Sequence, residues 1–439
     1  MVSFKRQEII IFAAVTAFLT ATSAGDADAA SLREELMDLV TEHPLIRSGA
    51  AQVGSTEQGV RATLSPFLPN LSVRGEIGRE KVDTPSFRAS PDGKFDAKPE
   101  EVTVTLTQNL WDGGAKYADR RGARMQQEVA EYTLTSTRQS AIFEGTSGYL
   151  NVLRQSQLLA IAQQNEQSIR NQLNLEDERV KRGAGIAVDV LQAKSRLQFA
   201  LEQRASVQGA LQDANSRYLQ VFGRIPISTE MTMPSRQPEI PEDIETSVAI
   251  GLANNPQILA AQRQIDIVDA RRDSIKAEYQ PSIDLVFESG YEREFNGVPD
   301  IRRDYSGRLR ATWTLFNGFG TQSRSKQAAF DGQARMADLA QIRRKTEETI
   351  RIAWHALATA EERAELLANA VNIAGEVYDS RRKLRDAGRE TVINVLDAES
   401  EVLAAQINYT SAQIDARIAR YQLLLAMGQL EIDVIDPAR

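Results

Sequence analysis

The sequence predicts a mainly α-helical fold that also contributes strands to a membrane β-barrel, built from an internally duplicated unit. The run DVL at residues 189–191 matches NVL at 394–396, and the same spacing of about 205 residues aligns Gly183 with Gly388. Self-similarity at a fixed spacing is the sequence signature of a repeated structural unit. Each half also contains two short segments of alternating polarity and one long helical hairpin, which predicts the mixture of strands and helices.

Length and composition limit the classes of protein to consider. The chain has 439 residues, a formal net charge of −8 and no cysteine. One duplicated unit accounts for this length better than three unrelated domains. Because no basic stripe stands out, nucleic acid is not an expected partner. Without cysteine we expect no disulfide, no thiolate metal site and no lipidated N-terminal cysteine.

The first 29 residues have the pattern of a secretory signal peptide. Lys5 and Arg6 precede an apolar run over residues 9–19, and small residues follow, with candidate cleavage sites near Ala24 and Ala29. The apolar run is too short for a membrane-spanning helix. We therefore expect an exported chain, and any part of it that enters a membrane must consist of β-strands.

The prolines and the repeat spacing of about 205 residues divide the rest of the chain into segments. Pro226, Pro234, Pro238 and Pro241 mark a loop-rich connector between the two repeats. The expected segments are a signal peptide (1–29), a first repeat (30–224), a connector (225–242), a second repeat (243–428) and a C-terminal tail (429–439).

Two strands are expected in each repeat, because apolar and polar residues alternate there with a period of two. In the last of them Tyr305, Gly307 and Leu309 share one face, and Arg308 and Arg310 share the other. Strands of about ten residues cross a bilayer when tilted. The expected strands span residues 71–79, 101–111, 283–291 and 305–316.

A soluble β-sandwich would bury the same apolar faces, but the export signal and the length of the helices favour membrane strands. Four strands cannot close a barrel, and open sheet edges are not tolerated in lipid. Several chains must therefore share one barrel. Two chains would give eight strands and three would give twelve, and the sequence does not choose between them.

A long helical hairpin follows each strand pair. No proline interrupts residues 115–182, which predicts a helix on the order of 100 Å long. A polar helix of that length implies coiled-coil packing. The expected hairpins span residues 115–222 and 319–427, with turns at Gly183–Gly185 and at Gly388.

The order of these segments resembles the TolC family of outer-membrane efflux and secretion channels, over essentially the whole mature chain. The helix starts VDVLQA at 188–193 and INVLDA at 393–398 carry the resemblance most specifically. It implies a homotrimer with a twelve-stranded barrel in the outer membrane of a Gram-negative bacterium and an α-helical tunnel through the periplasm. It also implies two partners, a periplasmic adaptor (membrane fusion) protein and an inner-membrane ABC or other transporter.

The resemblance further implies that the helix turns form the periplasmic mouth of the tunnel. Asp397 matches a position of an acidic ring, and Asn394 stands where an aspartate is common. Glu390 lies where some members carry a gating arginine, and Asp189 matches an aspartate that pairs across the mouth. Acidic residues also suit the first turn of a helix, which is the structural alternative for both aspartates. The candidate partners of Asp189 are Lys181, Arg182, Arg385 and Arg389.

Two further sets of residues are expected to make contacts. The exposed turns should meet the adaptor, through Arg182, Gly183, Gly185 and Gly388. Aromatic residues at strand ends should lie at the membrane interface, where aromatic side chains anchor barrels, with core packing as the alternative. These aromatic residues are Trp111, Tyr305, Trp313 and Phe316.

Three functions follow from this reading. The first is an exit duct for type I secretion of adhesin-like or toxin-like proteins, favoured by the segment TWTLFNGFGTQSRSKQ at 312–327 and by the missing lipidation cysteine. The second is a duct for multidrug or small-molecule efflux, and the third is a periplasmic coiled-coil adaptor without a pore. An enzyme or a cofactor is not expected, because the sequence has no P-loop, no G-x-S-x-G and only two histidines.

Overall fold

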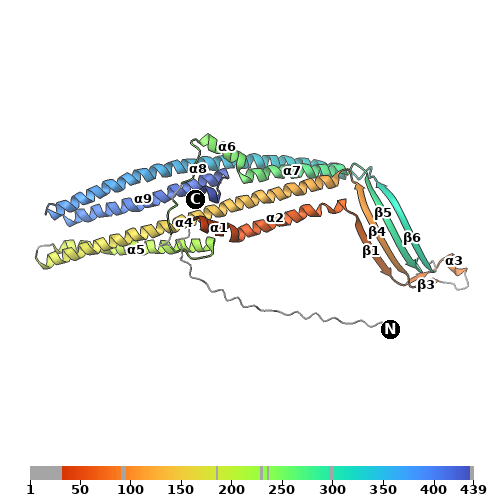
Figure 1. Cartoon of the computed structure of the whole chain (residues 1–439), viewed down its shortest axis with the longest axis horizontal. Coiled ribbons are helices and arrows are strands. Elements are labelled where there is room, and N and C mark those ends of the chain that lie inside the picture. The colour runs from red at the N-terminus through yellow and green to blue at the C-terminus, as the bar shows by residue number, and fades with distance from the viewer. Residues whose placement is uncertain are drawn as a thin grey trace, which may run out of the picture.

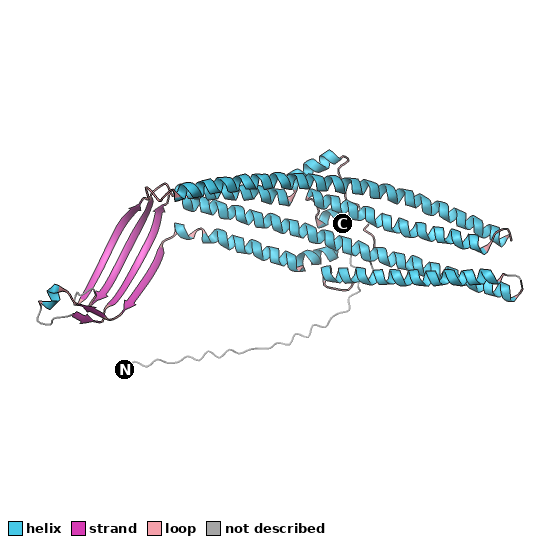
Figure 2. Ribbon diagram, turned by 180° about the vertical axis from the view of Figure 1, so that it is seen from behind, coloured by secondary structure: helices cyan, strands magenta, loops and turns pink. Residues whose placement is uncertain are grey.

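The computed structural model describes residues 32–89, 95–183, 186–227, 231–234, 237–295 and 300–435. The expected signal peptide and Gly185 lie outside these ranges. The described chain is elongated, with a sheet at one end and a layer of long helices extending from it (Figures 1 and 2).

The two helical hairpins have identical lengths. The first consists of α4 (Ala115–Lys181) and α5 (Ala187–Phe222), and the second of α8 (Gly320–Asp386) and α9 (Val392–Met427). Every bound of the second hairpin lies 205 residues after its counterpart, as from 115 to 320 and from 222 to 427. The predicted duplication is therefore confirmed.

Shorter helices complete the layer between the hairpins and the sheet. They are α2 (Pro44–Ala62), which η1 (Ser65–Phe67) follows, and α7 (Pro256–Ala277). Both α2 and α7 begin with proline, which suits the first helical turn because its missing N–H needs no partner there. Packing runs in the order α2, α4, α7, α8 near the sheet, whereas α5 and α9 replace α2 and α7 toward the turns.

The hydrophobic core lies near the middle of the long helices. There α1 (Leu32–Glu42) and α6 (Ile244–Asn254) pack against them, and α10 (Ile432–Ile435) packs against α1. Leu36, Tyr149, Ile350 and Met427 are fully buried in this core. This packing fixes the two hairpins to each other far from their turns.

A four-stranded antiparallel sheet has the order β1 (Asn70–Ile77), β4 (Glu100–Trp111), β5 (Ser282–Arg293) and β6 (Ile301–Thr312). It joins the strand pairs of both repeats, because β4 of the first repeat pairs with β5 of the second. Within the described residues β1 and β6 each have a strand on one side only, so both edges of the sheet are open.

The register gives the sheet one polar and one apolar face. Leu71 pairs with Leu106, which pairs with Phe287, and Leu309 lies further along the same face. The neighbouring row, on the opposite face, runs from Ser72 through Thr105 and Glu288 to Ser306. Alternate residues of a strand point to opposite faces, so the two rows lie on opposite sides of the sheet. At the end of the sheet away from the helices, Glu100, Arg293 and Arg303 interrupt the apolar face.

Two details differ from the sequence prediction. The strand expected over residues 305–316 begins and ends four residues earlier, because β6 pairs along the whole of β5, from Ile301 opposite Arg293 to Thr312 opposite Ser282. The loop expected between the first two strands contains three short elements, β2 (Glu80–Val82), α3 (Pro85–Arg88) and β3 (Phe95–Ala97). None of the helices in the described ranges combines the length and hydrophobicity that crossing a bilayer requires.

Candidate functional site at the hairpin turns

The second hairpin reverses direction at Gly388. The N–H of Gly388 donates to the Arg385 carbonyl at 2.9 Å, and the N–H of Arg389 donates to the Leu384 carbonyl at 2.9 Å. These two bonds form a Schellman motif, whose residue after the helix adopts the left-handed conformation. Gly388 has a φ of 74°, which glycine adopts without the steric cost of a Cβ.

Helix α4 of the first hairpin also ends at a glycine with a positive φ. Gly183 has a φ of 76°, and its N–H donates to the Val180 carbonyl at 2.9 Å. Arg182, the last residue before it, donates its backbone N–H to the Glu178 carbonyl at 3.1 Å. Both turns lie at the end of the molecule opposite the sheet (Figure 1). The residues expected to contact an adaptor, apart from Gly185, are thus together at one end.

Glu390 and Asn394 interact with each other at the start of α9. The Thr391 hydroxyl accepts the Asn394 N–H at 3.4 Å and so caps the helix. The Glu390 carboxylate accepts a hydrogen bond from the Asn394 side-chain amide and another from the Thr391 N–H, at 3.0 Å. These bonds, the first above all, lower the pKa of Glu390, because they favour the charged form.

Arg385 forms a buried ion pair with a residue of the first hairpin. Its Nη2 lies 2.5 Å from Oε1 of Glu176 on α4, and Arg179 approaches the same oxygen at 3.3 Å. The Arg385 and Glu176 side chains are only 13% and 7% exposed. Sequence reasoning missed Glu176, because no local pattern marks the partner of a residue 209 positions away.

Asp397 also pairs across the two hairpins. Its carboxylate forms an ion pair with Arg196 of α5, and both side chains are nearly half exposed, at 48% and 42%. Arg196 was not among the predicted residues. The carboxylate of the expected acidic ring is therefore partly neutralised within its own chain.

A third contact also joins the two hairpins. Gln172 of α4 donates to the Glu399 carboxylate of α9 at 2.8 Å. The contact borders a cavity of about 260 Å³ that Tyr378 and Arg382 of α8 also line. Burial raises the pKa of Glu399, although hydrogen bonds from Ser168 and Gln172 act in the opposite direction.

The other predicted charged residues do not pair with Asp189 within the chain. Lys181 lies 2.7 Å from Asp177, and Arg182 lies 3.8 Å from Glu178. Asp189 sits in the first turn of α5, where a carboxylate interacts favourably with the helix dipole. No ion pair joins Asp189 or Arg389 to another described residue.

The four predicted aromatic residues are exposed. Trp111 ends β4, and Trp313 and Phe316 lie in the connection from β6 to α8, at the end of the sheet that adjoins the helices. The indole N–H of Trp313 donates to the Tyr279 carbonyl at 3.1 Å, which fixes its ring. Tyr305, which is 80% exposed, lies nearer the other end of the sheet.

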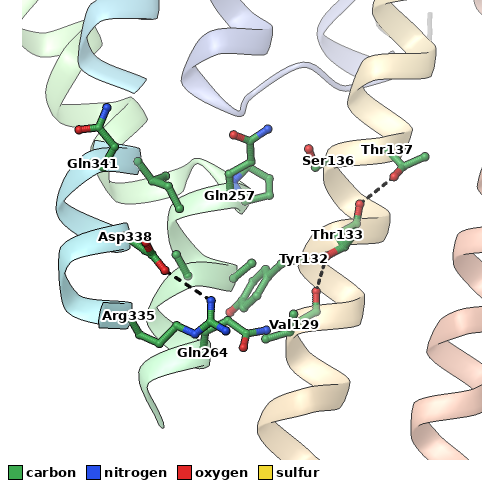
Figure 3. A pocket seen from close by; sticks show the side chains of 14 residues that line it. Val129, Tyr132, Thr133, Ser136, Thr137, Gln257, Gln264, Arg335, Asp338 and Gln341 are labelled. Atoms are coloured by element: carbon green, nitrogen blue, oxygen red, sulfur yellow. Dashed lines mark hydrogen bonds and ion pairs between the residues drawn. The ribbon is translucent and has the colours of Figure 1, made fainter. Parts of the chain in front are cut away.

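A larger cavity lies far from the turns. It measures about 600 Å³ and is lined by α4, α7 and α8. In Figure 3 Tyr132 extends from α4 toward the ion pair that Arg335 and Asp338 form on α8 at 3.4 Å. Across the described residues, no three His, Asp or Glu side chains gather as they would to hold a metal ion.

This combination defines a class of protein. A sheet with one apolar face and two open edges, joined to two hairpins whose longer helices measure about 100 Å, is the architecture of a subunit of a channel that continues from a membrane barrel into a helical tunnel. The chain belongs to the Outer membrane efflux protein family, whose sequence profile matches residues 36–224 and 250–429, one segment in each half. It is therefore a protein of the outer membrane, with helices that extend into the periplasm.

Individual relatives agree with this assignment. The outer membrane efflux protein BepC of Brucella suis is 23% identical over 435 residues, covering 98% of this chain and 92% of that protein. The outer membrane protein TolC of Escherichia coli is 20% identical over 420 residues, covering 91% and 83%, which confirms the predicted family. The alkaline protease secretion protein AprF of Pseudomonas aeruginosa is 23% identical over 383 residues, covering 83% and 79%.

A solved structure supports the fold. The open state of the MtrE outer membrane channel of Neisseria gonorrhoeae superposes with a TM-score of 0.75 at 15% identity, over 99% of both chains. The predicted fold class is therefore confirmed, and the alternative of a periplasmic adaptor without a pore has no support from these relatives.

Proposed function

We propose that three copies of this chain form a passive exit duct through the outer membrane and the periplasm. The open sheet edges carry this proposal. Strands β1 and β6 would leave unpaired N–H and C=O groups in lipid, which is not tolerated, so each must pair with another copy. Two copies would give a barrel nearly filled by side chains, whereas twelve strands from three copies leave a lumen.

An exposed apolar stripe along α8 supports the same assembly. Ile352, Leu366 and Ile373 are each about 60% exposed and recur at multiples of seven residues. Such a repeat is typical of a coiled-coil seam. Because α8 forms one edge of the helical layer, a neighbouring copy would cover this stripe.

In this duct the hairpin turns form the periplasmic mouth. The pairs Arg385–Glu176 and Arg196–Asp397 join the second hairpin to the first within one chain. Opening then requires the second hairpin to swing away and both ion pairs to separate. An adaptor that contacts Arg182, Gly183 and Gly388 would bias this movement, while an inner-membrane transporter supplies the energy.

Charged side chains at the mouth would set the ion preference. Three copies of Asp397 form an acidic ring, and Asn394 leaves the adjacent position uncharged. Asp189, which has no ion pair with a described residue of its own chain, would pair with a basic residue of the next copy, such as Arg389. A carboxylate ring attracts cations through its local field.

The cargo we propose is protein, exported by a type I pathway. The strand-to-helix segment at 312–327 and the lack of cysteine support this choice, and AprF is named for the secretion of a protease. The name of BepC instead describes efflux, so small-molecule efflux is the second candidate. The duct itself performs no chemistry in either case.

Deleting the gene separates the two kinds of cargo. Type I secretion predicts that one or a few proteins disappear from the culture medium, while drug sensitivity stays unchanged. Efflux predicts increased sensitivity to several compounds, with the secreted proteins unaltered. Complementation with the wild-type gene is the control, and unchanged secretion together with increased sensitivity would reject protein cargo.

A further inference from the structure

The apolar face of the sheet contains a groove. It measures about 420 Å³ and crosses strands β4, β5 and β6. Gly307 lies opposite Phe287, and a Cβ on this glycine would come within 3.1 Å of the Phe287 ring. The glycine therefore gives the groove its depth. The apolar-face residues that line it are Val104, Leu106, Phe287, Ser289, Tyr305 and Gly307.

Arg303 lies directly beyond the groove on the same face. It pairs in register with Tyr291, and the next pair on this face toward the helices is Tyr305 with Ser289. Arg303 and Tyr305 point to the same side because they are two residues apart in one strand. The groove thus ends at a guanidinium flanked by two tyrosines.

Three arginines on β5 and β6 have carboxylate partners, whereas Arg303 on the apolar face and Arg310 on the polar face form no ion pair with a described residue. The paired arginines are Arg293 with Glu100, Arg302 with Asp304, and Arg308 with Glu288. Only the first of these pairs shares the apolar face with Arg303, because Arg302 and Arg308 occupy alternate positions of β6. Arg303 is therefore a basic group of this face that is available to a bound anion.

The position of Arg303 along the strand corresponds to the outer membrane surface. It lies ten residues from Trp313, about 33 Å along an extended strand, or about 25 Å along the barrel axis at the usual tilt. That distance matches the height of the apolar band of outer-membrane barrels. With Trp313 at the periplasmic interface, Arg303 is at the level of the outer headgroups.

We propose that the groove and Arg303 form a binding site for a phosphorylated glycolipid of the outer leaflet. An acyl chain lies over Gly307 and against Phe287, and a lipid phosphate accepts hydrogen bonds from the Arg303 guanidinium. The planar guanidinium suits a phosphate, since it donates two parallel hydrogen bonds. Tyr291 and Tyr305 lie at the interface, where tyrosine is favoured. The site rests on the proposed barrel, because only there does this face meet lipid.

The test uses the full-length protein, purified in detergent and freed of lipid. Native mass spectrometry measures binding of purified lipid A that carries both phosphates, and of the same lipid A after removal of the phosphates. The wild type should bind the phosphorylated lipid about tenfold more tightly, as one charge-assisted contact predicts. Arg303→Gln should abolish this preference but still bind the dephosphorylated lipid. Gly307→Leu, which fills the groove, should weaken binding of both.

Arg310→Gln is the matched control, because Arg310 lies on the same strand but on the polar face. It should behave as the wild type. An unchanged phosphate preference in Arg303→Gln overturns the proposal. Conductance of the same samples in planar bilayers distinguishes failure of the lipid site from failure of the proposed barrel. Conducting channels without a phosphate preference reject the lipid site alone, whereas protein that forms no channel rejects both the barrel and the site.

Discussion

Arg385 at the end of α8 lies 2.5 Å from Glu176 of α4, although 209 residues separate them in the sequence. This is the most buried ion pair among the residues that the structure describes. Since α8 and α4 belong to different hairpins, the pair fixes the position of one turn relative to the other. The movement that opens the proposed mouth must separate these two charges.

Replacing Arg385 should therefore open the mouth. Arg385→Gln leaves the buried Glu176 carboxylate without its main partner, and breaking a buried pair in this way typically costs about 3–5 kcal/mol. We expect a higher single-channel conductance in planar bilayers than for the wild type. In the double variant Glu176→Gln with Arg385→Gln the conductance should rise less than in Arg385→Gln, because no unpaired buried charge remains.

Arg121→Gln is a suitable control for this experiment. Arg121 pairs with Asp273 at 2.6 Å, but both side chains are about half exposed, and the pair lies between α4 and α7 near the sheet. Pairs this exposed contribute about 1 kcal/mol or less. A conductance for Arg385→Gln equal to that of Arg121→Gln would contradict a role of the buried pair in closure.

Neutralising Arg196 and neutralising Asp397 should change the ion selectivity of the channel in opposite directions. Asp397→Asn removes three carboxylates from the proposed ring and should lower the cation-to-anion permeability ratio about two- to threefold at moderate salt. Arg196→Gln unmasks the same carboxylates and should raise the ratio by a similar factor. Reversal potentials under a salt gradient measure both effects. Equal permeability ratios in the wild type and both variants would show that Asp397 does not contribute to an acidic ring.

The turn at Gly388 should not tolerate a side chain. Gly388→Ala forces alanine to a φ of 74°, which costs about 1–2 kcal/mol, although open space surrounds the added methyl group. Gly375→Ala, in the interior of α8 about three turns before its end and equally open, should instead stabilise the helix by up to about 1 kcal/mol. The thermal unfolding midpoint should lie below that of the wild type for Gly388→Ala and above it for Gly375→Ala. A stabilised Gly388→Ala protein would show that the turn has another conformation.

The contributions of Glu399 and Glu390 to folding stability should change with pH in opposite directions. Burial raises the folded-state pKa of Glu399, so its contribution to stability is fully present below the ordinary glutamate pKa of about 4.3 and is lost as the pH rises. The pKa of Glu390 is lowered, so its contribution is present above that value and is lost in acid.

Two neutral variants test this contrast through the thermal unfolding midpoint. At pH 7 Glu399→Gln should raise the midpoint, since it removes a buried charge, whereas Glu390→Gln should lower it. At pH 4 both differences from the wild type should shrink. A Glu399→Gln midpoint below that of the wild type at pH 7 would show that the Gln172 contact outweighs the burial of the charge.

The sequence predicted the long helices, the turns and the four long strands, but not the contacts between them. Gly183 and Gly388 locate both turns, because a positive φ nearly requires glycine, and the uninterrupted stretches between proline and glycine locate the long helices. The start of β6 was placed four residues too late, since Arg302 and Arg303 interrupt the apolar alternation that marks the rest of the strand.

At the turns, the sequence identified charged residues but not their partners. Asp397 and Arg385 were predicted, whereas Arg196 and Glu176 were missed. Both missed residues lie within long helices rich in charged side chains, where an ordinary solvated residue has the same local pattern. Only the packing of one hairpin against the other brings each pair together.

Single-particle electron microscopy of the detergent-purified protein tests the central claim most directly. The account predicts a threefold-symmetric tube more than about 100 Å long, with a detergent belt around the end that contains the sheet. A monomer in plain buffer, with no detergent bound to the sheet, would contradict both the shared barrel and the exit duct.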